Sequence, residues 1–259
     1  MTIPPYTTPR NLLGGKTALI TAAAGTGIGF AAAKRCAEEG ATLLISDIHE
    51  RRLSEAAQAI QDATGKRPAM QLCDVTKEDQ VQTLKAAALK EFGGAPDVLI
   101  NNAGLGGSTA VVDMTDDQWG RVIDVSLTSV FRMCRAFLPA MYERKTGVII
   151  NNASVLGWRA QALQSHYAAA KAGVMAFTRC AAIEAAEHNV RINAVSPSIA
   201  MHAFLAKVTT EEQLEQLSRQ EAFGRPAEVW EIANVMVFLA SEYSSYMTGE
   251  VVSVSSQRA

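Results

Sequence analysis

The chain has 259 residues, which at about 150 residues per domain corresponds to one large domain or two small ones. Hydrophobic residues make up 48% and charged residues 19%, a composition typical of globular proteins rather than disordered or fibrous ones. The 24 lysines and arginines nearly balance the 26 aspartates and glutamates, so the formal net charge of −2 argues against a nucleic-acid-binding surface.

Cysteine spacing and the N-terminal sequence exclude further classes. The four cysteines lie far apart without a C-x-x-C, and no H-E-x-x-H occurs, so neither a disulfide framework nor a metal site is expected. Residues 1–10 contain three prolines and no apolar segment of a signal peptide, which predicts a flexible arm. No run reaches the roughly 18 apolar residues that a membrane span needs, and we expect a cytoplasmic protein.

Short aliphatic segments alternate with longer helical patterns along the rest of the chain. Strands are predicted at residues 17–21, 42–47, 69–73, 98–101, 148–152, 191–195 and 251–254. Helices are predicted at 28–39, 50–63, 77–92, 116–141, 165–188 and 226–241. This alternation predicts one α/β domain over residues 11–259, with a Rossmann-like, doubly wound parallel sheet of about seven strands. An eight-unit barrel would need about eight strand–helix units, more than the pattern offers.

Residues 199–223 form an additional segment after the sixth predicted strand. Thr209-Thr210-Glu211-Glu212 resembles a capping box that starts a short helix. Because ligands of doubly wound sheets bind at the carboxyl ends of the strands, we interpret this segment as a substrate lid. A helical excursion on the surface is the alternative.

A glycine-rich turn follows the first predicted strand and begins the first helix. It comprises Gly25, Thr26, Gly27, Ile28 and Gly29. Glycines here let the backbone approach a pyrophosphate, whose charge is favoured at a helix N-terminus, although such a turn can also be purely structural. Asp47, at the end of the second predicted strand, suits the hydroxyls of an adenosine ribose and would repel a 2′-phosphate. We therefore expect NAD rather than NADP, a preference that Arg51 and Arg52 would weaken.

Tyr167 and Lys171 lie four residues apart on a predicted helix, and therefore on one face of it. A free tyrosine has a pKa of about 10, and a nearby ammonium group lowers that pKa because it favours the phenolate. Ser154 follows the fifth predicted strand, where its hydroxyl could hold a substrate oxygen. A tyrosine and a lysine at this spacing also occur by chance, so the prediction depends on their position at a strand end and a helix start.

Motifs along nearly the whole chain resemble the short-chain dehydrogenase/reductase family. They are the glycine turn, Cys73-Asp74-Val75, Asn101-Asn102-Ala103-Gly104, Ser154 with Tyr167 and Lys171, Ser196-Pro197, and Met247-Thr248-Gly249. The resemblance implies a single Rossmann-like domain that uses NAD(P) to interconvert a secondary alcohol and a ketone by hydride transfer. It also implies a small-molecule substrate, no membrane or nucleic-acid partner, and a homo-oligomer, usually a tetramer.

Roles for single residues follow from the same resemblance. Tyr167 would be the acid and base, Lys171 would lower its pKa and bind the nicotinamide ribose, and Ser154 would polarise the reacting oxygen. The implied contacts with the rest of the cofactor are Asp74, Val75, Asn102, Ala103, Gly104, Pro197 and Ile199.

Three positions depart from the family pattern. Ala22 stands where the family has glycine, and the turn is one residue longer, which affects the phosphate geometry. Ser126 replaces an asparagine that relays protons to the lysine through water, so we expect a slowed or rerouted relay, with catalysis retained. After Pro197, Ser198 replaces a glycine, and His202 replaces a threonine that contacts the nicotinamide.

Residues 21–29, 151–161 and 243–259 are similar, within this family, to dehydrogenases of actinobacterial steroid catabolism. Those enzymes act on the bicyclic indane-propionate remnant left after sterol rings A and B are removed. The resemblance implies a hydrophobic cyclic substrate, carried as a CoA thioester. The candidate substrate contacts are Leu105, Leu156, Trp158, Arg159, Met201, His202 and Phe204.

Other functions fit parts of the sequence. A catalytically silent, dinucleotide-binding regulatory protein would account for Ser126 and the altered turn, but not for the intact Tyr167 and Lys171. A methyltransferase would use the glycine turn and leave those two residues without a role. A 3-oxoacyl-thioester reductase would share the catalytic residues and differ in its substrate.

Overall fold

Seven parallel strands form the centre of the computed structural model, which describes residues 3–201 and 211–256. In the order in which they pair, the strands are β3 (Ala69–Leu72), β2 (Thr42–Asp47), β1 (Thr17–Thr21), β4 (Val98–Asn101), β5 (Gly147–Asn152), β6 (Val190–Pro197) and β9 (Val251–Val254). Every neighbouring pair is parallel. The predicted doubly wound parallel sheet is confirmed, with strand ends shifted by a few residues.

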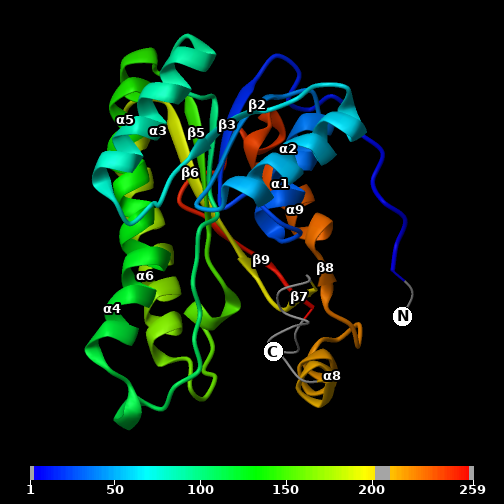
Figure 1. Cartoon of the computed structure of the whole chain (residues 1–259), viewed down its shortest axis with the longest axis vertical. Helices are drawn as coiled ribbons and strands as arrows, with labels where there is room; N and C mark the ends of the chain where they lie inside the picture. Colours follow the sequence, from blue (N-terminus) through cyan, green and yellow to red (C-terminus); the bar gives the residue numbers. More distant parts are fainter. Residues whose placement is uncertain (1–2, 202–210, 257–259) are drawn as a thin grey trace.

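Helices cover both faces of this sheet (Figure 1). One layer consists of α1 (Ile28–Glu38), α2 (Glu50–Thr64) and α9 (Val229–Ala240), and the other of α3 (Glu78–Phe92), α5 (Ser129–Arg144) and α6 (Ser165–Ala186). Consecutive residues of a strand point to opposite faces, so Leu19 and Ile20 of β1 belong to two different hydrophobic cores. Over the described residues, no helix is both long and apolar enough to cross a membrane.

The helix predicted at 116–141 is interrupted. A π-helical turn, η2 (Asp124–Thr128), joins α4 (Asp116–Ile123) to α5. Within and after this turn, Thr128 Oγ1 donates to Ile123 O at 3.5 Å and Ser129 Oγ donates to Val125 O at 2.6 Å. A π turn places one extra residue in a helix and is frequent at functional sites. The hydrophobic periodicity on either side contains no signal for it.

The segment after β6 contains two short strands and a helix. β7 (Ala200–Met201) pairs in parallel with β8 (Ala227–Glu228), and α8 (Glu211–Gln220) lies between them in the sequence. The helix predicted at 226–241 begins later than expected, because Ala227 and Glu228 belong to β8. Glu228 is the N-cap of α9 and forms a capping box with Glu231. The short helices η1 (Val111–Asp113), η3 (Val155–Gly157) and η4 (Glu242–Ser244) complete the described elements.

Residues 3–10 have no helix or strand but contact α1 and α9. Tyr6 Oη donates to Glu38 at 2.7 Å, and the Tyr6 ring packs edge-on against Trp230 with the ring centroids 5.3 Å apart. Arg35 Nη1 donates to Thr7 O at 3.3 Å. Prolines prevent regular structure without preventing side-chain packing, so residues 3–10 make these contacts without a helix or strand, and the flexible arm stays a prediction.

Candidate active site

The glycine turn between β1 and α1 is held by the ends of β2 and β4. Ala23 N donates to Ser46 O at 3.0 Å, and Asn102 Nδ2 donates to Ala22 O at 3.1 Å. A Cβ atom on Gly29 would overlap Ala22 O and Asn102 Nδ2, so α1 can begin this close to the turn only with glycine there. Ala22 keeps the turn by adopting a left-handed conformation, with φ at 50°.

The N-terminus of α1 is open to a ligand. Its N-cap residue is Gly27, and no described side chain caps the helix there. The first backbone N–H groups of a helix have no partner inside the helix, and together with the helix dipole they favour a phosphate. The residues of this turn therefore fit a dinucleotide.

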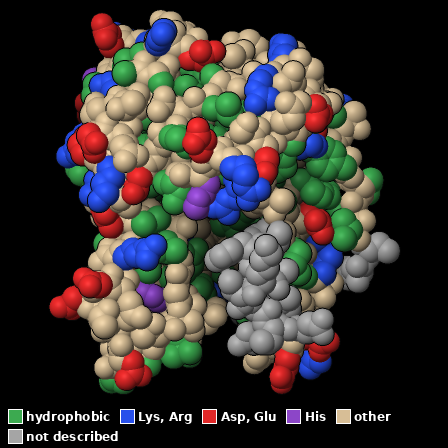
Figure 2. All heavy atoms as spheres, in the orientation of Figure 1, with side chains coloured by type: hydrophobic (Ala, Val, Ile, Leu, Met, Phe, Trp, Pro, Cys, Tyr) green, Lys and Arg blue, Asp and Glu red, His purple; other side chains and the backbone are tan. Residues whose placement is uncertain are grey.

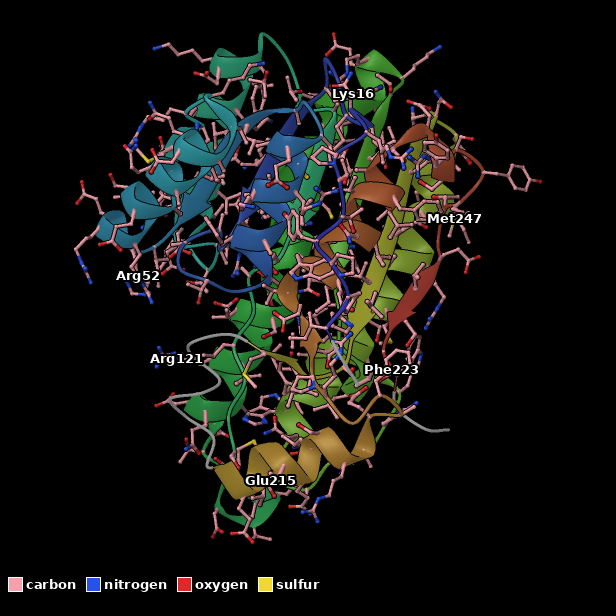
Figure 3. All side chains as sticks on the ribbon, turned by 90° about the vertical axis from the view of Figure 1, so that its right-hand side faces the viewer. Lys16, Arg52, Arg121, Glu215, Phe223 and Met247 are labelled. Carbon is pink, nitrogen blue, oxygen red and sulfur yellow. The ribbon has the colours of Figure 1, made fainter. Side chains whose placement is uncertain are left out.

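Asp47 is fixed beside the turn. Its Oδ2 accepts from Ala24 N and its Oδ1 from His49 N, both at 3.1 Å. Burial raises the pKa of the Asp47 carboxyl, whereas the backbone donors and the charge of Arg52 lower it. Arg51 pairs with Glu55 at 2.9 Å, which leaves Arg52, labelled in Figure 3, as the arginine whose charge acts on Asp47.

Two further predicted cofactor segments follow β3 and β4. Asp74 Oδ1 accepts from the backbone and the hydroxyl of Thr76, at 2.9 and 2.7 Å, which shapes the loop around the buried Val75. Asn102 N donates to Thr21 Oγ1 at 3.0 Å, and Asn102 Oδ1 accepts from Asn152 Nδ2 at 2.9 Å. Asn102 thus connects the carboxyl ends of β1 and β5.

Ser154, Tyr167 and Lys171 come together at the carboxyl end of β5. Ser154 lies two residues beyond that strand, and the other two side chains lie on one face of the first turns of α6. The Ser154 and Tyr167 side chains are hydrogen-bonded to each other. Lys171 Nζ lies 5.6 Å from the centroid of the Tyr167 ring and donates to Asn152 O at 2.6 Å.

Burial dominates the electrostatics of this group. It raises the pKa of Tyr167, although the hydrogen bond with Ser154 lowers it, and it lowers the pKa of Lys171 to about 8. Lys171 therefore keeps its proton at neutral pH, even though its side chain is only 2% exposed. The structure holds a protonated phenol beside a buried ammonium group, an arrangement that favours proton exchange with a bound alcohol or ketone.

A pocket of about 280 Å³ opens onto Ser154 and Tyr167. It is also lined by Ile28, Asn152, Leu156, Gln161, Pro197, Ile199 and Leu217. An outer groove of about 540 Å³ shares Leu156, Gln161 and Leu217 with this pocket and contains Arg159. Figure 2 shows the surface hollowed beside the part built on α4 and α6. Gln161 and Leu217 are site residues that no motif indicated.

Ser126 lies in the π turn, away from this pocket. Its Oγ accepts from Leu105 N and donates to Leu105 O, both at 2.9 Å, and its side chain is buried. The single hydroxyl proton of Ser126 is directed to Leu105 O, and one acceptor lone pair of the oxygen remains. These bonds hold the loop after β4, and the role of Ser126 in a proton relay stays a prediction. A Cβ atom on Gly106 of this loop would lie 3.9 Å from Tyr167 Cδ2.

The other candidate substrate contacts are dispersed. Trp158 is 51% exposed and lines neither the pocket nor the outer groove, and Met201 lies in β7. Leu105 is partly buried in the loop held by Ser126. His202 and Phe204 lie outside the described residues.

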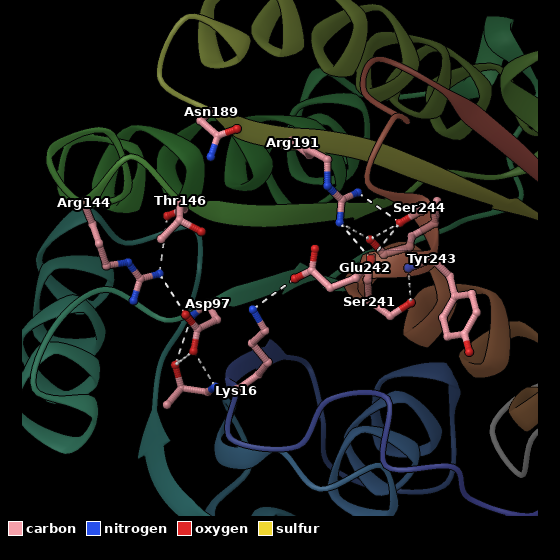
Figure 4. Close-up of polar contacts among 12 residues, drawn as sticks. Lys16, Asp97, Arg144, Thr146, Asn189, Arg191, Ser241, Glu242, Tyr243 and Ser244 are labelled. Atoms are coloured by element: carbon pink, nitrogen blue, oxygen red, sulfur yellow. Dashed lines mark hydrogen bonds and ion pairs between the residues drawn. The ribbon is translucent and has the colours of Figure 1, made fainter.

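A separate pocket of about 350 Å³ lies at the amino ends of the strands. Figure 3 places two of its residues, Lys16 and Met247, at the end of the molecule opposite Glu215 of α8. Figure 4 shows two ion pairs at this pocket: Lys16 with Glu242, both of which line it, and the lining Asp97 with Arg144, each at 3.2 Å. Because doubly wound sheets bind ligands at their carboxyl ends, we assign this pocket a structural role.

Comparisons with known proteins agree with the fold and the motifs. A family profile described as enoyl-(acyl carrier protein) reductase matches residues 22–256. The (5R,7aS)-5-hydroxy-7a-methyl-1-oxo-2,3,5,6,7,7a-hexahydro-1H-indene-carboxyl-CoA reductase of Mycobacterium tuberculosis is 61% identical over 247 residues, which cover 95% of this chain and 94% of that protein. A 3-oxoacyl-(acyl-carrier-protein) reductase of Chlamydia muridarum is 36% identical over 244 residues, which cover 94% and 97%.

A solved structure is similar over its whole length. The crystal structure of a short chain dehydrogenase from Mycobacterium smegmatis has a TM-score of 0.88 and 55% sequence identity, covering 100% of this chain and 99% of that one. The fold and the family that the sequence predicts are therefore confirmed. The chain belongs to the short-chain dehydrogenase/reductase family, whose members bind NAD(P), and it is an oxidoreductase that acts on a hydroxyl or ketone group.

Proposed function

We propose that this protein interconverts a secondary alcohol and a ketone on a bicyclic remnant of steroid rings C and D, carried as a CoA thioester, with NAD as its cofactor. The observation that carries the proposal is the hydrogen-bonded Ser154 and Tyr167 beside buried Lys171, at the floor of a pocket. The substrate class is supported by the name of the Mycobacterium tuberculosis relative.

The three side chains divide the proton chemistry among them. In reduction, Tyr167 Oη donates its proton to the substrate oxygen while Ser154 Oγ holds that oxygen by a hydrogen bond. In oxidation, Tyr167 takes the proton from the hydroxyl, and the charge of Lys171 stabilises the phenolate. A bound nicotinamide ring supplies or accepts the hydride at the substrate carbon. Since burial raises the pKa of Tyr167, the protonated phenol needed for reduction prevails at neutral pH.

The proposed cofactor residues, which the family resemblance implies, lie at or beyond the carboxyl ends of the strands. Gly25 to Gly29 would hold the pyrophosphate, and Asp74 and Val75 would contact the adenine. Asn102 to Gly104 would line the cofactor channel that leads to Lys171. A Cβ atom on Gly104 would lie 3.3 Å from Lys171 Nζ, which shows how closely this loop passes the lysine. Pro197, Ile199 and Ile28 line the catalytic pocket, where they would pack against the nicotinamide.

Asp47 supports the choice of NAD. Both of its carboxylate oxygens are held by backbone N–H groups, so the negative charge cannot swing away from a 2′-phosphate. We expect Asp47→Ser to reduce the ratio of kcat/KM for NAD over NADP by at least about tenfold, the change that 1.4 kcal/mol produces. An unchanged ratio would remove this argument for NAD.

The pocket and the outer groove suit two different parts of the proposed substrate. Leu156 and Leu217 offer an apolar surface to the fused rings, where both cavities meet. The outer groove adds Arg159, Gln216 and Gln220 to Gln161, which both cavities share. Amide side chains match the amides of a pantetheine arm, and a guanidinium matches a phosphate.

Assembly and location are further parts of the proposal. Phe131 of α5 is 42% exposed and Ile183 of α6 is 73% exposed, which supports association through these helices into a homotetramer. The cysteines among the described residues are free thiols, which supports a reducing cytoplasm. Light scattering on the purified protein at several concentrations would give the oligomeric state.

Turnover assays test the proposed reaction. The purified protein is mixed with NADH and a bicyclic ketone CoA thioester, or with NAD and the corresponding alcohol, and cofactor absorbance is followed. Tyr167→Phe should lose at least about 100-fold in kcat, since a positioned acid contributes that much. Tyr243→Phe, which changes a tyrosine that is 76% exposed, is the matched control.

Three results would contradict parts of this proposal. Wild-type turnover by Tyr167→Phe would show that the acid is misassigned. Faster turnover of an acyclic 3-oxoacyl thioester than of the bicyclic substrate would assign the other substrate class. Binding of NADH in calorimetry without turnover of any alcohol or ketone would identify a silent, dinucleotide-binding protein.

A further inference from the structure

The last residue of β9 and the residues after it contact the chain near both ends of the segment 199–223. At its start, Ser198 N donates to Val254 O at 3.2 Å, next to the pairing of β6 with β9. At its end, Ala222 N donates to Ser256 O at 2.5 Å. Residues 254–256 therefore connect the point where this segment leaves the sheet with the point where it returns.

A buried carboxylate strengthens the second connection. Glu221 Oε2 accepts from Ser256 N at 3.1 Å and from Ser256 Oγ at 2.8 Å. The Glu221 side chain is only 2% exposed, and a buried carboxylate is costly unless hydrogen bonds compensate for its lost hydration. We call the two residues with these bonds the Glu221–Ser256 clamp.

The surroundings of the clamp are polar. Glu221 Oε1, Ser198 Oγ and Arg225 Nε have no hydrogen-bond partner among the described residues, and all three residues line one pocket of about 150 Å³. A pocket of this size that contains these polar atoms has room for ordered water that bridges them. The nearby Arg225 forms its ion pair with Glu231, at 2.7 Å. The hydrogen bonds described for the Glu221 carboxylate come from Ser256.

The clamp lies one helical turn from the catalytic pocket. α8 ends at Gln220, directly before Glu221, and Leu217 of its last turn lines the pocket that contains Ser154 and Tyr167. A helix rises about 1.5 Å per residue and moves as a rigid body. An anchor at the end of α8 therefore fixes the position of Leu217 relative to Ser154 and Tyr167 in the same pocket. This anchor joins residues 35 positions apart and lies close to Leu217 in the wall of the pocket.

We propose that Glu221 is a positioning residue, whose bonds to Ser256 hold α8 against the catalytic pocket and set the affinity for substrate. The part of this inference that concerns substrate rests on the proposed function. Loosening the clamp should raise the KM for a substrate that fills the pocket. It should leave kcat nearly unchanged, because Ser154 lies just beyond β5, Tyr167 and Lys171 lie on α6, and the bonds between Glu221 and Ser256 involve neither element.

Four variants separate this role from a general loss of stability. Glu221→Ala removes the clamp, Glu221→Gln keeps an acceptor for Ser256 N, and Ser256→Ala removes only the hydroxyl bond. Glu215→Ala is the matched control, because Glu215 is an exposed glutamate of the same helix whose ion pair, with Arg219, is also exposed.

The first measurement is hydrogen exchange, which needs no substrate. Peptides covering 212–220 and 252–256 should exchange faster in Glu221→Ala than in the wild type, whereas α6 peptides should not change. The second is steady-state kinetics. Glu221→Ala should raise KM by about tenfold with kcat within about threefold, while Glu221→Gln and Glu215→Ala stay near the wild type.

Each outcome decides the proposal. Unchanged exchange of α8 in Glu221→Ala would overturn the clamp, and faster exchange with an unchanged KM would overturn its role in positioning. A wild type without turnover would refute the proposed function, and the exchange data would still decide the clamp. If Glu221→Ala does not fold, Ser256→Ala provides the same comparison with a smaller expected change.

Discussion

Lys171→Met should separate the catalytic value of the lysine from its cost to stability. Burial lowers the pKa of Lys171 from 10.5 to about 8, so at pH 7 the folded state must hold a charge that it solvates poorly. A shift of this size corresponds to about 3 kcal/mol at about 1.4 kcal/mol per pKa unit. Methionine is similar in length and carries no charge, so that cost disappears in the variant.

The variant also loses a hydrogen bond. Lys171 Nζ donates to Asn152 O at 2.6 Å, and leaving that carbonyl without its partner costs about 1–3 kcal/mol. The net change at pH 7 is therefore a stabilisation of up to about 2 kcal/mol, with turnover reduced by at least about 100-fold. Stability and activity then change in opposite directions at one residue.

The pH dependence gives the sharper test. The folded-state pKa of Lys171 is below its unfolded value, so between pH 8 and 10.5 the unfolded chain binds more protons and wild-type stability rises with pH. Lys171→Met lacks this contribution. The free energy of unfolding of the wild type, relative to the variant, should therefore rise by about 2 kcal/mol between pH 7 and 9.5.

Urea unfolding of both proteins at several pH values measures that difference directly, because other titrating groups are common to both. Lys145→Met changes a lysine outside the site and is the matched control. A difference that stays constant from pH 7 to 9.5 would refute the reasoning, since it would mean that Lys171 is not desolvated.

Three further predictions concern the glycine turn and α1. Ala22→Gly should raise the free energy of unfolding by up to about 1 kcal/mol, because relief of the left-handed φ of 50° outweighs the entropy that glycine adds to the unfolded chain. Thermal melting measures this change in stability, and a lower Tm of the variant would contradict the prediction. Gly29→Ala should abolish NADH binding in calorimetry, because its Cβ would overlap Ala22 O and Asn102 Nδ2; wild-type affinity would place the cofactor elsewhere. Arg35→Met should destabilise the protein by about 3–5 kcal/mol in urea, because Glu39, 1% exposed, loses its ion pair; a loss below about 1 kcal/mol would show that the backbone donors Arg10 N and Leu12 N suffice.

The grouping of residues in the candidate active site was largely predictable, because its parts are local patterns. Strands with apolar residues at every position indicate a sheet covered on both faces, and the carboxyl ends of parallel strands meet at one edge. That rule alone brings the turn after Thr21, the carboxylate of Asp47 and the hydroxyl of Ser154 together. Tyr167 and Lys171 share a face because four residues make nearly one helical turn.

Other features depend on contacts between distant segments, which no local pattern contains. The hydroxyl of Ser126 forms two hydrogen bonds with the backbone of Leu105 because a π turn and a loop pack together, and its position in the sequence does not indicate these bonds. Residues 3–10 pack on α1 and α9 because Tyr6 contacts Glu38 and Trp230 there. Glu38 lies 32 positions from Tyr6 in the sequence, and Trp230 lies near the other end of the chain. Helical periodicity and proline content describe neither contact.

The sequence by itself determined the order of strands and helices, the parallel sheet and the residues that meet at its carboxyl edge, because each follows from periodicity and from spacing of a few residues. Only the tertiary structure decided that Leu217 forms a wall of the pocket and that Glu221 and Ser256 hold α8 in place. Those contacts depend on how segments far apart in the chain pack, and packing is set by the shapes of all the surrounding side chains together.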